Sequence, residues 1–385
     1  MTKLRVLALS LGILGGLIIS GCVEKDNQIP PNPLVNISPT IGFKKIWVEK
    51  LGKGTGGKYL ILDPIASDTL TFSDHAGNIF RVAADSGKLL GSYHLKVNLT
   101  TGISENKETI FVPDSSGSLL AINKETGKLI WSKQLGGQIL SRPLVTPENI
   151  LIVTTTSGGI IALNSKNGEI IWYQEQPIPD QTLHLTGRPI LAGKYLLTGF
   201  ANGTLVCFLV KTGEIVWQYQ LANYQDSKER FTDLVSQPLV KENIVIAGDY
   251  QGSLVALRLH SGRLIWRHRI ASFQNMALSE KQFYVVDRFS DIWSFNIENG
   301  LMIWHQNLLQ GRKITGVNLF GNNLIAADRF GYVHLLDPKT GQLLGRERLS
   351  KNGFLSQPIA LGNRIYLYDV AGIAIAASLE KIKKS

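Results

Sequence analysis

The sequence predicts an all-β fold, an eight-bladed β-propeller whose blades are four-stranded antiparallel sheets. A loop glycine opens a short apolar run, a second glycine follows ten residues later, and this unit returns every 38 to 49 residues. A period near forty built from short strands is typical of propeller blades, which bury their faces only against neighbouring blades. The first position of the unit holds Gly77, Gly117, Gly158, Gly203, Gly252, Ser290 and Gly331, and the second holds Gly87, Gly127, Gly168, Gly213, Gly262, Gly300 and Gly341.

Each unit has the composition of strands joined by tight turns. Between residues 150 and 175, the apolar runs 150–153, 160–163 and 170–173 are separated by Ser157-Gly158 and Asn167-Gly168. Short β-branched runs bounded by Gly and Asn predict strands, since these two residues accept the positive φ that tight turns require. Aspartates three residues before the first glycine, such as Asp114, Asp249 and Asp328, are interpreted as part of the same turn signature.

A tryptophan lies four residues after the second glycine in five units. These are Trp131, Trp172, Trp217, Trp266 and Trp304, while Gly91 and Gly345 take the position in the other two units. A large ring repeated in register is expected to pack between adjacent blades, where its area stabilises most.

The two ends of the chain together supply one further blade. Residues 43–51, with Trp47, resemble an outermost strand without the three preceding ones, and residues 354–377 resemble three strands without an outermost one. Pairing them closes the ring and removes exposed sheet edges. Seven complete units and this shared blade predict eight blades, and seven is the alternative.

The first residues have the pattern of an export signal. Lys3 and Arg5 precede an apolar stretch over 6–19, and Ile19-Ser20-Gly21-Cys22 resembles the lipobox of bacterial lipoproteins. The resemblance implies a signal peptide over 1–21, lipid on Cys22 and, since Val23 follows, an outer-membrane location; an unmodified cysteine is the alternative. Proline-rich residues 22–41 are predicted to be a flexible tether, 42–379 the propeller and 380–385 a basic tail.

Composition narrows the function classes. The formal net charge is +10, but an exported protein without a basic-aromatic recognition motif is not expected to bind nucleic acid. The basic surface suits anionic lipid or an acidic partner. After processing, Cys207 in the apolar run 205–210 is the only cysteine left, so no disulfide within the chain is expected and Cys207 is interpreted as a buried core thiol. Neither metal-ligand spacing nor a nucleophile or phosphate motif is present, so we expect no catalytic residue, metal or cofactor.

The blade sequence Ala121-Ile122-Asn123-Lys124-Glu125-Thr126-Gly127-Lys128-Leu129-Ile130-Trp131 resembles the repeats of pyrroloquinoline-quinone-type propellers. Together with a lipobox, a tether and a single eight-bladed ring, it is similar to the BamB family of outer-membrane lipoproteins. The resemblance implies a non-enzymatic scaffold that binds periplasmic domains of BamA, with other lipoproteins of the assembly complex as further partners. The alternatives are a quinoprotein dehydrogenase and a scaffold of another envelope complex.

Two long links between blades locate a candidate binding surface. The spacing from tryptophan to the next blade's proline grows from 12 residues (Trp131 to Pro143) to 17 (Trp172 to Pro189) and 21 (Trp217 to Pro238). The added residues form loops at 177–188 and 222–237, which we place on the same face because the chain reverses at each strand. Long loops on a rigid scaffold are where binding residues usually lie.

Leucines in the first loop are interpreted as anchors for a partner. Leu183 and Leu185 match the Leu-x-Leu segment that the resemblance implies contacts BamA, and Asp233 matches an acidic contact position. Thr186 and Thr204 stand where the family has arginines, and Val235 replaces a second acid, so Arg188 or Arg230 is considered as a substitute. The alternative is that the leucines cap the propeller's own core.

Overall fold

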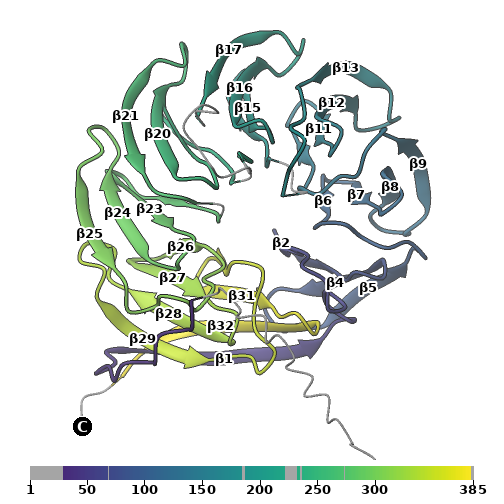
Figure 1. Ribbon diagram of the computed structural model, residues 1–385. Helices are drawn as coiled ribbons and strands as arrows, with labels where there is room; N and C mark the ends of the chain where they lie inside the picture. The colour runs from purple at the N-terminus through teal and green to yellow at the C-terminus, as the bar shows by residue number, and fades with distance from the viewer. Residues whose placement is uncertain are drawn as a thin grey trace, which may run out of the picture.

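The computed structural model describes residues 29–67, 69–183, 187–221, 232–234, 236–272 and 274–382, and it confirms an all-β propeller (Figure 1). Eight four-stranded antiparallel sheets surround a central opening. Within these ranges, no helix has the length and hydropathy of a membrane span. In each blade the strands are designated a to d from the centre outwards.

The first four blades follow one another along the chain. Blade 1 contains β2 (Ile65–Ala66), β3 (Thr69–Ser73), β4 (Asn78–Ala83) and β5 (Leu89–His94), and blade 2 contains β6 (Ser104–Glu105), β7 (Thr109–Pro113), β8 (Ser118–Asn123) and β9 (Leu129–Gln134). Blade 3 contains β10 (Leu144–Val145), β11 (Ile150–Thr154), β12 (Gly159–Asn164) and β13 (Ile170–Glu175), and blade 4 contains β14 (Ile190–Ala192), β15 (Tyr195–Gly199), β16 (Thr204–Leu209) and β17 (Ile215–Gln220).

Three more blades have the same order. Blade 5 contains β18 (Leu239–Lys241), β19 (Ile244–Gly248), β20 (Ser253–Arg258) and β21 (Leu264–Arg269), and blade 6 contains β22 (Ala277–Leu278), β23 (Gln282–Val286), β24 (Ile292–Asn296) and β25 (Met302–Gln306). Blade 7 contains β26 (Val317–Phe320), β27 (Asn323–Ala327), β28 (Tyr332–Leu336) and β29 (Leu343–Arg348).

Blade 8 closes the ring with the two ends of the chain. Its strands are β30 (Ile359–Leu361), β31 (Arg364–Tyr368), β32 (Ile373–Lys381) and β1 (Ile41–Lys50), with β1 outermost. β1 runs antiparallel to β32, pairing Phe43 with Leu379 and Val48 with Ile375 across a register shift at Lys45/Trp47. The prediction of eight blades with a shared last blade is therefore confirmed, and the seven-blade alternative is excluded.

The repeated tryptophans hold neighbouring blades together, as predicted. The Trp172 indole of blade 3 donates a 2.8 Å hydrogen bond to the carbonyl of Val210 in blade 4, and its ring lies against Gly213. Equivalent bonds join Trp47 to Ala84, Trp131 to Ser165, Trp217 to Leu259, Trp266 to Ile297 and Trp304 to Pro338. The buried clusters likewise draw residues from adjacent sheets, so the core lies between blades.

The two units without a tryptophan fill the same junction differently. Next to Gly91, the Tyr93 hydroxyl donates a 2.6 Å bond to the Lys124 carbonyl, and its ring packs on Gly127. At Gly345 the Ile41 carbonyl lies where a side chain would stand. The entry of β1 beside blade 7 therefore requires glycine at that position.

The turn aspartates serve the role predicted for them. Asp114 Oδ1 accepts 2.9 Å bonds from the amides of Ser116 and Ser118, and Asp328 Oδ1 accepts the corresponding pair from Phe330 and Tyr332. Each carboxylate caps the turn between strands b and c. These repeated acids are structural groups of the turns.

The turns between strands b and c and the links between blades share one face, which we call the loop face. A backbone bond joins the two segments around the ring, for example Thr156 to Gln138, Arg288 to Ala271 and Val370 to Gly353. The a–b and c–d turns are joined to each other on the opposite face, as in the bond from Ser165 to Asn149.

The described part of the expected tether, residues 29–40, lies against blade 7. Asn32 donates from its amide to Gln310 (2.9 Å), Val35 accepts from Arg346 (3.0 Å), and Thr40 donates to Leu344 (2.9 Å). Ile37 packs against the cluster shared by blades 6 and 7. We call residues 29–40 the strap. Its contacts with blade 7 were not predicted from the sequence.

Candidate functional site

The candidate site is a composite of three segments on the loop face of blades 3 to 5. They are the link after β13 (176–183 and 187–189), the turn between β15 and β16 (200–203), and residues 232–234 and 236–238 before β18. The prediction that the two long links share a face with the strand turns holds for their described residues. Three neighbouring blades thus contribute to one surface.

A buried carboxylate joins the two links. Asp233 is 0% exposed, and its Oδ1 accepts a 3.0 Å hydrogen bond from the backbone amide of Leu183, fifty residues away. Leu183 itself is half-buried. The structure therefore differs from the expectation that Asp233 meets a partner directly, because its side chain lies beneath the surface and holds the backbone of Leu183. We call the link that contains Leu183 the leucine loop, of which residues 176–183 and 187–189 are described.

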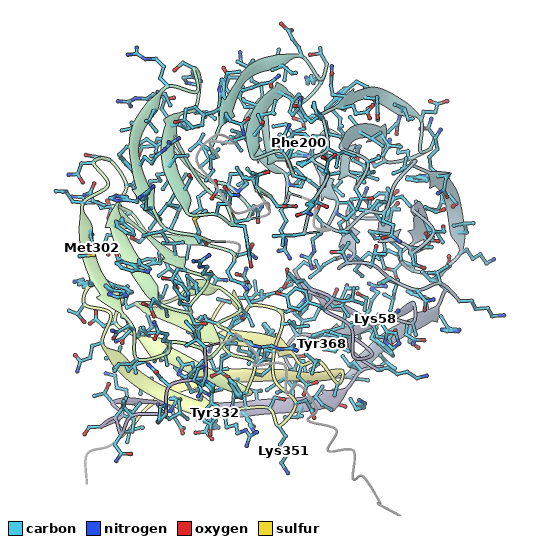
Figure 2. All side chains as sticks on the ribbon, in the orientation of Figure 1. Lys58, Phe200, Met302, Tyr332, Lys351 and Tyr368 are labelled. Atoms are coloured by element: carbon cyan, nitrogen blue, oxygen red, sulfur yellow. The ribbon has the colours of Figure 1, made fainter. Side chains whose placement is uncertain are left out.

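The strand turn of blade 4 supports both links. Leu234 donates to the Phe200 carbonyl (3.2 Å), and the Thr232 hydroxyl donates to the Ala201 carbonyl (2.6 Å). Gly187 lies directly against the backbone of Gly199, where a side chain would clash. Phe200 packs on Phe208 below it, and Figure 2 shows Phe200 in this sector of the ring. Such cross-links restrain the loops before any partner arrives.

Other predicted contact residues have partners within the propeller. Arg188 Nη1 forms a 2.9 Å ion pair with Asp63 Oδ2, and both side chains are largely buried. Thr204 is 6% exposed, and its hydroxyl donates to Gln220. The structure therefore places neither Arg188 nor Thr204 as a free polar contact. Leu185, Thr186, Arg230 and Cys22 lie outside the described residues.

An exposed apolar residue that the sequence reasoning missed belongs to the same surface. Ile178 is 47% exposed and lies between Pro177 and Pro179 in the first link. An isoleucine flanked by prolines has no strand face to bury it, which is the signal that would have identified it. With Leu183 it extends the apolar part of the site.

The channel mouth beside this site is crossed by the link from β1 to β2. Arg142 of blade 3 donates to the carbonyls of Asp63 and Pro64, while Arg188 of blade 4 pairs with the Asp63 carboxylate. Burial lowers the pKa of Arg142 from its ordinary value, and the Asp63 charge opposes that shift.

The described residues contain neither a metal-binding cluster nor a reactive thiol. No group of three or more His, Cys, Asp or Glu side chains there is arranged to hold a metal ion. Cys207 is fully buried, and burial raises the pKa of its thiol to about 12. That thiol is protonated near neutral pH and does not contribute a nucleophile.

Sequence comparison places the chain among outer-membrane assembly factors. The family described as "Outer membrane protein assembly factor BamB" matches residues 75–306 and 288–381. A BamB of Legionella pneumophila is 30% identical over 376 residues, which cover 95% of this chain and 96% of that protein. The Shewanella oneidensis BamB is 28% identical, with 92% and 94% of the two chains covered, and that of Escherichia coli is 26% identical, with 95% and 97% covered.

Solved structures share the fold. BamB from Moraxella catarrhalis superposes with a TM-score of 0.78 at 21% identity, over 87% of this chain and 99% of the other. The quinohemoprotein alcohol dehydrogenase of Comamonas testosteroni gives 0.70 at 11% identity, over 89% of this chain and 78% of the other. Identities this low show the propeller fold alone.

Proposed function

Because the chain belongs to the BamB family of outer membrane protein assembly factors, we propose that it is a lipid-anchored scaffold that binds the periplasmic domains of BamA. The family consists of assembly factors, and the chain is accordingly not an enzyme. In this proposal Cys22 carries the lipid, the propeller faces the periplasm, and the composite loop site holds the partner. The scaffold thereby assists insertion of outer-membrane proteins.

The observation that carries the proposal is the hydrogen bond that holds the backbone of Leu183 in place. The bond from Leu183 to Asp233 and the packing on residues 199–203 restrain the loop on the rigid propeller. Ile178 presents a further exposed apolar side chain in the same link. A pre-positioned apolar anchor loses little conformational entropy on binding, which is a common property of interface hot spots.

The test is the double variant Leu183→Ala with Leu185→Ala. If the partner buries both side chains, each truncation removes about 1.5 to 3 kcal/mol, so affinity for isolated BamA periplasmic domains should fall by one to several decades. Affinity is measured by titration calorimetry with the fold confirmed by thermal melting. The matched control is Leu89→Ala with Leu90→Ala, two leucines that are each 51% exposed on the outer strand of blade 1.

A variant of Asp233 tests the same proposal independently. Asp233→Ala removes the acceptor for the Leu183 amide without altering an exposed charge, so binding should weaken to the same extent at low and high salt. A strong salt dependence would instead assign the carboxylate to the interface. Wild-type affinity in the double leucine variant would move the interface elsewhere on the ring.

A further inference from the structure

We propose that the loop face of blades 6 to 8 contacts the headgroup region of an anionic lipid bilayer. The contact surface, here called the aromatic sector, consists of Ile29, Tyr59, Phe289, Leu308 and Phe330 together with the lysines and arginines around them. The orientation of the propeller relative to the bilayer, with this sector towards the membrane, rests on the proposed lipid anchor at Cys22. The lipid contact itself rests on the surface and is tested without the anchor.

The sector gathers exposed apolar side chains at loop tips. Tyr59 is 56% exposed, and Ile29, Phe289, Leu308 and Phe330 are between 37% and 41% exposed. Among the described loop-face residues, Ile178 is the one further large apolar side chain with comparable exposure. Other exposed apolar side chains lie mainly on outer strands. Aromatic rings at the tips of loops suit the membrane interface, where an apolar body and a polar edge meet different surroundings.

Basic side chains surround these rings. Lys53, Lys58, Arg288, Lys313 and Lys351 are exposed on the same part of the loop face. Figure 2 labels Lys58 and Lys351, which come from the links on either side of blade 8. The acids of the neighbouring turns, Asp74, Asp328 and Asp369, are at most 1% exposed and accept backbone hydrogen bonds. Asp287 of the blade 6 turn is partly exposed, but the five exposed lysines and arginines outnumber it. The accessible charge of the sector is therefore positive overall, which favours anionic headgroups.

A cavity within the sector has the chemistry to receive a lipid phosphate. It measures about 550 Å³, and its lining includes the cations Arg288, Lys313 and Arg329 together with Tyr59. One acid, Asp287, also lines it, and its carboxylate accepts bonds from the amides of Phe289 and Asp291 and from the Trp293 indole. Arg329 Nη1 is buried and has no hydrogen-bond partner in the described part of the protein. A guanidinium nitrogen without an acceptor, close to further cations, is a suitable partner for a phosphate oxygen. The rings around the opening would lie at the level of the headgroups.

The strap brings the proposed anchor to the same place. Ile29 lines the cavity, Asn32 is held by Gln310 and Asn307, and Gly311 packs on Pro30 and Pro31. Ile29 lies seven positions after Cys22, and a fully extended chain spans about 25 Å over that length. A lipid on Cys22 would therefore keep this sector close to the bilayer. The leucine loop belongs to blades 3 to 5, so partner and lipid would use different sectors.

The first experiment measures lipid binding without an acyl chain. Protein beginning at residue 23, which retains every described residue, is sedimented with mixed phosphatidylcholine and phosphatidylglycerol vesicles and with pure phosphatidylcholine vesicles. Binding is expected to the mixed vesicles alone. Lys58→Glu with Lys351→Glu should weaken it by about fivefold or more for each site. The control pair Lys128→Glu with Lys211→Glu makes the same change in net charge on the opposite face and should bind like wild type.

Three results would overturn the proposal. They are no binding of the wild type to mixed vesicles, equal losses in both pairs, and a loss of binding to BamA periplasmic domains in the Lys58/Lys351 pair while vesicle binding stays unchanged. The last result would assign the sector to a protein partner instead of lipid. Circular dichroism melting of both pairs excludes unfolding as the cause.

The second experiment tests orientation with acylated full-length protein in liposomes. An environment-sensitive fluorophore is placed at Phe330→Cys, with Lys339→Cys at the opposite end of blade 7 as control, and buried Cys207 remains unlabelled. Quenching by brominated lipid is expected at position 330 and not at 339. Protein that fails to attach to liposomes contradicts the anchor of the proposed function. Protein that attaches with both probes in water contradicts the orientation inferred here.

Discussion

At the scale of single residues, the repeat is an arrangement of indole, carbonyl and glycine across six of the eight blade junctions. Trp172 donates to the Val210 carbonyl while its ring covers Gly213, whose φ is +71°. The glycine thus satisfies two demands at once, a left-handed backbone and the absence of a side chain beneath the ring. These separate demands explain why glycine recurs at this position in every complete unit.

Two glycines of blade 4 separate the two demands experimentally. Gly193 has a φ of +59° and no heavy atom near the position of a Cβ, so Gly193→Ala should cost about 1 to 2 kcal/mol of unfolding free energy from backbone strain alone. Gly213→Ala carries the same strain and also displaces the Trp172 ring, which should add about 1 to 3 kcal/mol. Urea unfolding of both variants measures the difference. Equal losses would show that the indole contact does not constrain the turn.

At the scale of elements, β1 performs two functions. It completes blade 8 by pairing with β32, and its beginning passes beside β29 of blade 7, where Thr40 bonds to Leu344. The bulge between Lys45 and Trp47 shifts the register of the pair and accompanies the burial of Trp47 to 8% exposure. One strand thus joins the first and last blades and positions the strap.

Truncations should rank these contributions. A chain beginning at residue 41 lacks the strap, including the burial of Ile37, and should lose about 1 to 3 kcal/mol while melting cooperatively. A chain beginning at residue 52 also lacks β1, which leaves the backbone groups along β32 unpaired, and should lose its cooperative transition. Scanning calorimetry compares them. Cooperative melting of the shorter chain at the same temperature would contradict closure by β1.

At the scale of the whole molecule, the propeller is a rigid ring whose loop face carries the features proposed for function. The composite leucine site lies over blades 3 to 5, and the aromatic sector lies over blades 6 to 8. The opposite face is formed by short turns such as 124–127 and 210–213. We therefore propose that the loop face is the functional face of the ring. Its aromatic sector would contact the membrane, and its composite leucine site would contact the partner.

The anchor is tested on the whole protein in cells. Since Cys22 is the proposed acyl acceptor, Cys22→Ser should leave a folded protein that no longer incorporates a fatty-acid analogue or remains with the membrane after a high-salt wash. Metabolic labelling followed by fractionation is the measurement. Cys207→Ser is the matched control, because its buried thiol is not available for acylation and the variant should remain labelled. Label retained on the Cys22→Ser protein would refute the lipobox interpretation.

The architecture could be predicted from sequence because its determinants are local and periodic. The glycine spacing, the tryptophans and the turn aspartates all act within one blade or between consecutive blades, so each repeat carries the same information. The closing strand was predictable for a related reason. Residues 43–51 and 354–377 are incomplete copies of the repeat, and each lacks what the other supplies.

The sequence could predict where the candidate site lies on the propeller, but it could not predict the contacts between the site's residues. Loop length and the leucines of the first long link indicated the place, whereas the burial of Asp233 beneath Leu183 and the pairing of Arg188 with Asp63 depend on residues 50 and 125 positions apart. No repeat specifies such pairs, because they arise where links from different blades converge over the channel. The strap and the aromatic sector were decided in the same way, since only the closed ring brings Ile29, Tyr59 and Phe330 onto one face.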